Sequence, residues 1–424
     1  MKYTLAVLLS LLSLIAAAQD PDRTYKASVH SVKLYRAGDI YAYPVLSLNS
    51  SDQLELHFDD FDGDVKNYYY SFQLCNADWT PCDLQRFDYI RGFQSSRISN
   101  YRSSSISMTR YTHYQCQFPE RNMTPSRSGN YMLKVFINDH ENELVFTKRF
   151  LVVENKVSIG ATVMQPFNAS NFKTLQRLQV GINTANSQVR AFSPQDFKIV
   201  MLQNNIWSTA LRTDRPDIFR GNYYEYSSDE GTSFSAGKEW RWIDLRSLQL
   251  LSDRMQRIVD TGKRYDVFIK PDVERKQQVY LYYTDLDGIY TIENREGNNP
   301  YWQSDYAYTH FTFVPPGNQP YNGKDVYVYG ELTGYATDAG SKMDFNESMG
   351  VYEKTLFLKQ GYYNYSYVTK PVNAAPGVPL SLENTEGNYY GTENSYTILV
   401  YYRAFGGRSD ELIAWTKVSS YFQR

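Results

Sequence analysis

The sequence predicts an all-β protein of tandem immunoglobulin-like β-sandwich domains, on the strength of three observations. The 424 residues include 39 tyrosines and 22 phenylalanines, and such side chains suit a pleated surface with one apolar and one wet face. Short runs of alternating apolar and polar residues recur between turns that contain glycine. Long apolar stripes with a 3.6-residue period are absent, and the best helical candidate is 245–260.

Residues 1–18 have the features of a secretory signal peptide. Lys2 is followed by an apolar run over 5–15 and by the small residues Ala16, Ala17 and Ala18, which fit a cleavage site. The run is too short for a membrane anchor, and no cysteine follows the expected cut, so a lipid anchor is not expected. The sequence therefore predicts an exported protein that does not insert into the membrane.

Polar residues at 154–156 and the prolines of 315–320 predict two domain boundaries, because proline removes a backbone donor and favours extended chain. The expected domains are an N-terminal sandwich over 25–155, a middle sandwich over 157–315 and a C-terminal sandwich over 321–424. Strands are expected in the first at 29–35, 45–48, 54–59, 68–75, 112–118, 131–137 and 145–153. In the middle domain they are expected at 178–182, 197–202, 265–269, 279–283 and 306–314.

The C-terminal domain has the clearest strand pattern. Tyr363, Tyr365 and Tyr367 alternate with polar residues after Gly361, which predicts a half-buried strand. The strand-like run 351–358 precedes that glycine, so a hairpin closing at Gly361 is expected. Further strands are predicted at 325–334, 396–403 and 411–415, the last two paired with each other across a glycine turn.

Three cysteines, Cys75, Cys82 and Cys116, are an odd number for an oxidising compartment. A reactive thiol or a metal ligand is one interpretation; a single bridge with one buried thiol is the favoured one. A Cys75–Cys82 disulfide would close a short loop and stabilise it by roughly 2–3 kcal/mol. Cys116 would stay reduced, on the same strand face as Tyr114 and Phe118.

Motifs that carry chemistry are missing. None of the five histidines has zinc-ligand spacing, and there is no nucleophile elbow, phosphate-binding glycine loop or dinucleotide fingerprint. The acidic stretch 59–64 resembles a calcium loop but lacks a glutamate at the twelfth position, so a solvated hairpin turn is expected. We expect no catalytic, cofactor-binding or metal-binding residue and no enzymatic activity, although a hydrolase with an unrecognised pair of acids stays open.

The charge balance gives no sign of a polyanionic partner. The formal net charge is −2, with 44 basic and 46 acidic residues and no block of like charge. Nothing therefore steers the chain towards nucleic acid, and no small-molecule substrate is indicated.

The stretches 326–334, 350–358 and 361–368 resemble the early-set immunoglobulin-like sandwiches linked to glycogen- and starch-binding modules. Those modules stack sugars on exposed tryptophans. Tyr335 falls where such a module often has one, and no tryptophan occurs between Trp302 and Trp415. Glycan binding by this domain, in the periplasm or at the cell surface, is the alternative function.

A second resemblance covers most of the chain. The matching stretches, in order, are 75–81, 89–93, 128–131, 238–244, 283–290, 304–308, 358–368, 396–403 and 409–412. Together they resemble the plug protein family of the type IX secretion system. One departure is Asp285-Leu-Asp-Gly288, where the family is expected to have Asp-x-Asn-Gly, and aspartate serves such a turn nearly as well.

The resemblance implies a periplasmic plug subunit that seals the periplasmic opening of a giant outer-membrane barrel translocon. Such barrels reach about 36 strands, and an open lumen of that size would leak. The partner would be the barrel protein, through a polar interface of moderate size. The residues that meet it are not specified by the sequence; the stretch 216–242 and the expected surface loop 97–107 are the first candidates.

Overall fold

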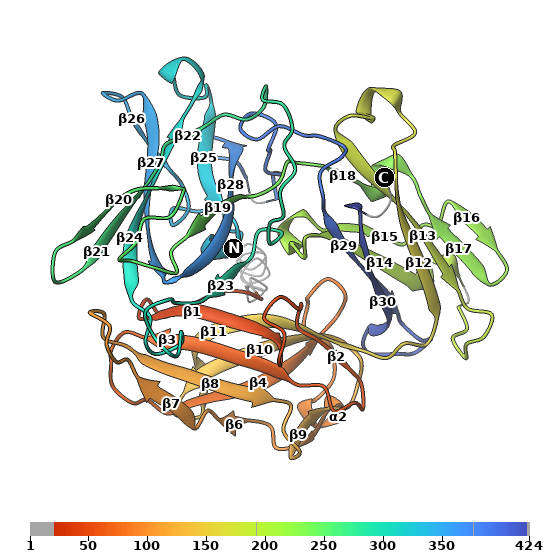
Figure 1. Ribbon diagram of the computed structural model, residues 1–424. Coiled ribbons are helices and arrows are strands. Elements are labelled where there is room, and N and C mark those ends of the chain that lie inside the picture. The colour runs from red at the N-terminus through yellow and green to blue at the C-terminus, as the bar shows by residue number, and fades with distance from the viewer. Residues whose placement is uncertain (1–20, 192, 376, 422–424) are drawn as a thin grey trace, which may run out of the picture.

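The computed structural model describes residues 21–191, 193–375 and 377–421, and it shows three β-sandwiches packed against one another (Figure 1). The predicted signal peptide lies outside the described residues. Strands dominate, so the all-β prediction is confirmed, whereas the immunoglobulin-like type stays a prediction. Within the described ranges, every helix is too short or too polar to traverse a lipid bilayer.

The first sandwich takes its strands from 29–153, within the predicted segment 25–155. One sheet has the order β1 (Val29–Arg36), β3 (Leu54–Asp60), β8 (Thr112–Phe118) and β7 (Asn100–Ser103). The other has the order β2 (Val45–Ser47), β11 (His140–Val153), β10 (Gly129–Ile137), β4 (Tyr68–Cys75) and β6 (Ser96–Arg97). A short ribbon accompanies them, formed by α2 (Arg86–Tyr89), β5 (Ile90–Gly92) and β9 (Met123–Pro125).

Alternation along the strands fills the core between these two sheets. Leu54, Leu56 and Phe58 of β3 are fully buried and meet Phe72 and Leu74 of β4. Successive side chains of a strand point to opposite faces, so the intervening residues face outward. In β10 and β11 that outer face also carries the apolar residues Met132, Leu151 and Val153, which pack on another sandwich.

The inserted sandwich, as we name the unit built from β19 to β28, lies at the upper left of Figure 1. Its first sheet contains β19 (Arg241–Asp244), β28 (Gly361–Pro371), β23 (Tyr290–Ile292) and β25 (Lys324–Tyr329). Its second contains β20 (Met255–Asp260), β21 (Tyr265–Ile269), β24 (Tyr306–Val314), β27 (Val351–Lys359), β26 (Asp344–Asn346) and β22 (Asp272–Val273).

The split sandwich, at the right of Figure 1, combines segments from both sides of the insertion. Its first sheet contains β12 (Ser158–Met164), β13 (Leu175–Asn183), β17 (Tyr223–Tyr226), β16 (Ile218–Arg220) and β18 (Ser233–Ser235). Its second has the order β15 (Leu211–Thr213), β14 (Phe197–Gln203), β29 (Ser395–Tyr402) and β30 (Glu411–Ser419). The remaining helices are α3 (Asp229–Thr232), η1 (Ala169–Asn171), η2 (Pro194–Asp196), η3 (Trp207–Thr209), η4 (Pro316–Asn318) and η5 (Glu331–Thr333).

The predicted division into 157–315 and 321–424 does not match this strand pairing. β14 pairs along its whole length with β29, and β24 pairs with β27, so both sandwiches cross the predicted boundary. The proline-rich stretch 315–320 contains η4 and connects β24 to β25 inside the inserted sandwich. Local composition marks a break between strands, but it does not tell which strands pair after the break.

Three finer predictions also differ from the structure. The helical candidate 245–260 contains no helix and ends in β20, and 279–283 is not a strand. Gly361 does not close a hairpin, because β27 and β28 lie in different sheets and the chain crosses between them there. β28 is buried on both faces, since Asn364 and Ser366 are covered as fully as the tyrosines. The predicted pairing of 396–403 with 411–415 is confirmed by β29 and β30.

Candidate functional site

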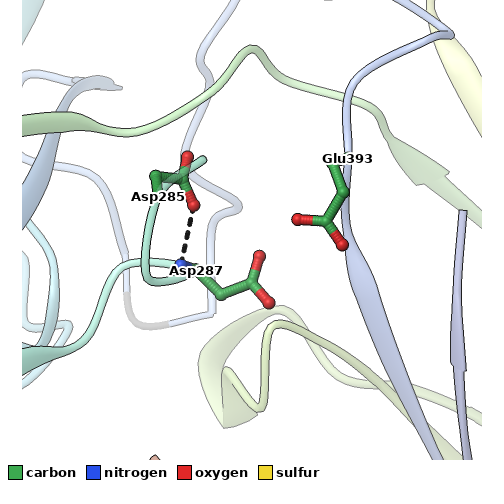
Figure 2. A group of neighbouring side chains, drawn as sticks. All are labelled: Asp285, Asp287 and Glu393. Carbon is green, nitrogen blue, oxygen red and sulfur yellow. Dashed lines mark hydrogen bonds between the residues drawn. The ribbon is translucent and has the colours of Figure 1, made fainter. Parts of the chain in front are cut away.

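Three carboxylates converge beside the point where the chain passes between the split and inserted sandwiches. Asp285 and Asp287 lie in the turn before β23, and Glu393 lies just before β29 (Figure 2). Each offers one oxygen, and the three oxygens lie within 4.8 Å of one another. Among the described residues, this is the group placed to hold a metal ion.

Burial and mutual repulsion act strongly on these acids. Burial raises the pKa of Asp285 to about 6. Burial and then the charge of Glu393 raise the pKa of Asp287 well above its ordinary value. Glu239, a neighbouring acid, has its pKa raised to about 7, chiefly by burial. Low dielectric surroundings disfavour the charged form of each group, so the arrangement would be stabilised by a compensating positive charge.

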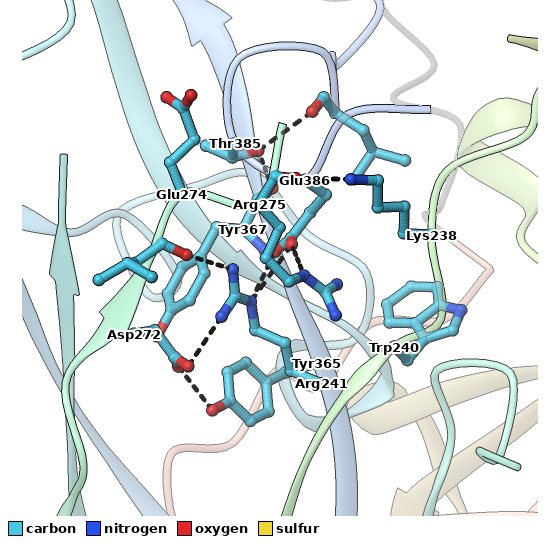
Figure 3. A network of polar contacts seen from close by, with 12 residues as sticks. Lys238, Trp240, Arg241, Asp272, Glu274, Arg275, Tyr365, Tyr367, Thr385 and Glu386 are labelled. Carbon is cyan, nitrogen blue, oxygen red and sulfur yellow. Dashed lines mark hydrogen bonds and ion pairs between the residues drawn. The ribbon is translucent and has the colours of Figure 1, made fainter. Parts of the chain in front are cut away.

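A second polar network surrounds Arg241 in the inserted sandwich (Figure 3). The Arg241 guanidinium donates from Nη1 to Asp272 Oδ1 at 2.8 Å and from Nε to Glu386 Oε1 at 2.9 Å. Arg275 donates to the other oxygen of Glu386 at 2.6 Å. Burial alone would raise the pKa of Glu386, but the two guanidinium groups hold it at about 2.

The Arg241 network is closed by hydroxyl groups of β28. Asp272 Oδ2 accepts hydrogen bonds from Tyr365 at 2.7 Å and from Tyr367 at 2.9 Å. Both carboxylates of the network are thus saturated with donors. Buried ion pairs of this kind fix geometry, and we assign the network a structural role in holding the strandless segment 380–392 against β28.

A third buried group joins the first sandwich to the inserted one. Lys359 at the end of β27 donates to Asp59 Oδ2 at 2.5 Å, and Tyr306 donates to the same oxygen at 2.6 Å. His113 Nδ1 lies 2.7 Å from Asp59 Oδ1. Burial alone would raise the pKa of Asp59, yet Lys359 and His113 hold it below its ordinary value.

The interpretation of 59–64 as a solvated hairpin turn holds only for Asp62 and Asp64, which are exposed, and the flanking strands β3 and β4 lie in different sheets rather than in a hairpin. Asp59 and Asp60 are completely buried at the end of β3, and Asp60 pairs with Lys66 at 2.7 Å. Asp62 also pairs with Lys66. Each of these three acids therefore has a lysine ammonium beside it, Lys359 at Asp59 and Lys66 at both Asp60 and Asp62.

The predicted Cys75–Cys82 disulfide is not formed, and all three cysteines are free. Cys75 packs on the outer face of its sheet beside Trp79 and Met132, whereas Cys82 packs against the core between the sheets. The two side chains thus serve opposite faces. Burial raises the pKa of Cys75 to about 12, and Cys116 packs with the core as expected.

The two stretches predicted as partner surfaces lie apart. The stretch 97–107 contains the exposed edge strand β7, and Ser105 N donates to Trp302 O of the inserted sandwich at 2.8 Å. The stretch 216–242 forms β16, β17 and β18 of the split sandwich and enters β19. Figure 1 shows β7 and β16 on different sandwiches at opposite sides of the view.

One comparison with known protein families matches a single structural unit of this chain, the first sandwich. A family model described as "Type 9 secretion system plug protein 1st domain" matches residues 29–154, which coincide with the first sandwich. The first sandwich therefore belongs to the family of type IX secretion plug first domains, which indicates that the protein is involved in type IX secretion.

One solved structure is similar to this protein along nearly the whole length of the chain. The crystal structure of a hypothetical protein from Parabacteroides merdae ATCC 43184 has 31% sequence identity and a TM-score of 0.88, and the match covers 94% of this chain and 98% of that one. A Pseudomonas fluorescens alkylpurine DNA glycosylase, AlkC, matches 30% of each chain at 11% identity with a TM-score of 0.17, too low to indicate relatedness. No curated protein matches.

Only some members of this cluster of carboxylates can be recognised in the sequence. Asp285 and Asp287 stand out in the sequence because they fall in a plug-family stretch. That stretch is predicted to form a turn, not a metal site. Glu239 also falls in a plug-family stretch, 238–244, but Glu393 lies 154 positions further on and in none of the matching stretches. Only the return of the chain from the inserted sandwich to β29 brings them together.

Proposed function

We propose that this protein is the periplasmic plug subunit that seals the periplasmic opening of the giant outer-membrane barrel translocon of type IX secretion. The observation that carries the proposal is the match of the first sandwich to the first domain of plug proteins. The protein would act by occupying space, without proton transfer, metal chemistry or a bound substrate.

The way the sandwiches are joined supports a stopper role, because a plug must keep its shape under load. The outer faces of β10 and β11 bury Met132 and Leu151 against Leu202 and Leu399 of the split sandwich. Across the other junction, the Lys359–Asp59 pair is accompanied by Lys33, which donates to Glu331 at 2.5 Å. Apolar and ionic contacts thus fix the first sandwich to both of the others.

An exposed apolar segment offers a surface for the barrel. In the strandless stretch 277–284, Val279 is 93% exposed and Leu281 is 74% exposed. The intervening Tyr280 stacks on Tyr389 with ring centroids 4.3 Å apart, which presents its neighbours outward. Protruding apolar side chains on a fixed segment are suited to act as interface anchors. We propose this segment as a contact surface alongside 97–107 and 216–242.

The test of the stopper role is uptake of a large, membrane-impermeant antibiotic by cells that lack the protein. We expect uptake to rise strongly and cargo export to fall only in part. Restoring the gene should restore the barrier. Unchanged uptake, with the barrel shown to be present and open, would contradict the proposal.

The contact surface is tested separately by pull-down of the barrel from outer membranes. The Val279→Asp/Leu281→Asp variant should recover at least tenfold less barrel, because two carboxylates would have to be desolvated at the interface. The matched control is Leu250→Asp/Leu251→Asp, which alters two residues 71% and 60% exposed on another loop of the same sandwich. Equal loss in both variants would count against this choice of surface.

Glycan binding through the inserted sandwich has less support. Tyr335, at the position where a sugar-stacking tryptophan is expected, is half-buried and packs edge-on to Tyr329 at 5.6 Å and Trp240 at 6.5 Å. Its ring is therefore not free to act as a stacking platform. A sugar-array measurement on the purified protein should show no binding.

A further inference from the structure

The cluster of carboxylates at the crossing between two sandwiches is held in a fixed conformation by hydrogen bonds and close packing. Asp285 accepts hydrogen bonds from the backbone N–H of Asp287 at 2.8 Å and from that of Trp240 at 2.5 Å. Gly288 follows with φ +84°, and a Cβ there would lie 2.7 Å from the Trp240 ring. The turn is thus pressed against Trp240, which fixes the two aspartates relative to the chain that enters the inserted sandwich.

A fourth carboxylate supplies an independent observation. Glu239 is only 2% exposed; its Oε1 accepts from the Tyr280 hydroxyl and from the backbone N–H of Glu393 at 3.3 Å. Its Oε2 is buried and has no hydrogen-bond partner among the described residues, and the same holds for Asp287 Oδ1. A buried carboxylate oxygen without a donor is costly.

The protein's own cations do not remove that cost. The charges of Arg275 and Lys417 act on Asp285 and Asp287 respectively. Arg275, however, is committed to Glu386, and among the described residues neither cation forms an ion pair with the group. Carboxylates as close together as Asp285, Asp287 and Glu393 repel one another unless a bound cation or protons reduce their charge.

We propose that Asp285, Asp287 and Glu393 bind a hard divalent cation, Ca²⁺, with Glu239 as the adjoining fourth carboxylate. Ca²⁺ takes six to eight oxygen ligands from carboxylates, carbonyls and water in flexible geometry. An all-oxygen set without histidine or cysteine suits Ca²⁺, Mg²⁺ or Mn²⁺ better than zinc or copper. Affinities in extracellular modules lie at about 10⁻⁴–10⁻³ M, and we expect this range here.

The position of the site gives the ion a structural effect. Glu239 lies on the segment that leaves the split sandwich, and Glu393 lies on the segment that returns to it. Asp285 and Asp287 belong to a loop of the inserted sandwich. A bound ion would therefore tie both crossings to that loop and fix the inserted sandwich against the split one.

The experiment uses the full mature chain, stripped with a chelator and titrated with Ca²⁺ while binding heat and thermal unfolding are followed. We expect one site and a Tm that rises with Ca²⁺ concentration, since a ligand that binds the folded state stabilises it. Tb³⁺ in place of Ca²⁺ should show luminescence when tryptophan is excited, because Trp240 adjoins the site.

The Asp287→Asn variant should bind Ca²⁺ at least tenfold more weakly and lose the Ca²⁺-dependent rise in Tm. Without Ca²⁺ it should be as stable as the wild type or more so, because one repelling charge is gone. Glu393→Gln serves as a second variant, and Asp62→Asn, in the acidic turn paired with Lys66, is the control that should bind normally. Absence of any Ca²⁺ effect on the wild type at millimolar concentration, or undiminished binding by both site variants, would overturn the proposal.

Discussion

At the scale of single residues, the buried charges of this protein are paired at the junctions between sandwiches. Lys359 is 1% exposed, and its ammonium lies between Asp59 and the ring of Tyr111, 4.4 Å from the ring centroid. Burial lowers the pKa of Lys359, and the charge of Asp59 opposes that effect. Each partner of such a pair is tolerable only because the other is present.

Replacing Lys359 by methionine should therefore destabilise the protein by about 3–5 kcal/mol, because Asp59 is left as a buried, uncompensated charge. Urea unfolding of the purified protein measures the loss. The control is Lys342→Met, which breaks a pair with Asp325 at a lysine whose side chain is 42% exposed, and should cost less than about 1 kcal/mol. Similar losses in the two variants would refute the assignment.

At the scale of elements, β28 organises the inserted sandwich. Its tyrosines at 363, 365 and 367 fill the core between the sheets, as their alternation predicts. Its other face is closed by the strandless segment 380–392, whose Glu386 accepts the Tyr367 backbone N–H at 3.0 Å. A strand that looks half-buried by sequence is thus fully buried, because a distant segment without strand pattern covers it.

The attachment of that segment should depend on pH through Glu386. Its pKa falls from 4.5 in the unfolded chain to about 2 in the fold, so its contribution is complete above about pH 4.5 and disappears as the pH falls towards 2. The contribution is on the order of 3 kcal/mol, at about 1.4 kcal/mol per pKa unit. Urea unfolding between pH 6 and pH 3 should show a shallower acid slope for Glu386→Gln than for the wild type.

The exposed Glu347 offers the control for this measurement. The Glu347→Gln variant should keep the wild-type acid slope. A Glu386→Gln variant with an unchanged slope would show that the carboxylate is not the group responsible.

At the scale of the whole molecule, sheet-on-sheet packing joins the first and split sandwiches. Trp79 and Trp207 meet edge to face with ring centroids 5.0 Å apart, and the Arg149 guanidinium lies over both rings, at 5.0 and 5.3 Å. Trp207 also donates from its ring nitrogen to the Tyr43 hydroxyl. Two sheets that share an apolar face in this way should unfold together.

We expect calorimetry of the wild type to show a single unfolding transition. Trp207→Ala should remove about 3–5 kcal/mol and separate the first sandwich as an earlier transition, since its own core stays intact. Phe405→Ala, at a side chain 91% exposed, should leave the profile unchanged. Two transitions in the wild type would contradict the expectation that the joined sandwiches unfold together.

The sequence by itself determined the β character of this protein, most of its strands and its family. Alternation and glycine turns are local consequences of side-chain sterics, so they can be read without knowing the fold; β4, β10 and the β29–β30 hairpin follow in this way. The tertiary structure alone decided that β14 pairs with β29, that Cys75 and Cys82 serve opposite faces, and that Glu239 and Glu393 join Asp285 and Asp287. Pairing between distant strands depends on the free energy of burying their shared faces, a property of two segments together that neither segment displays alone.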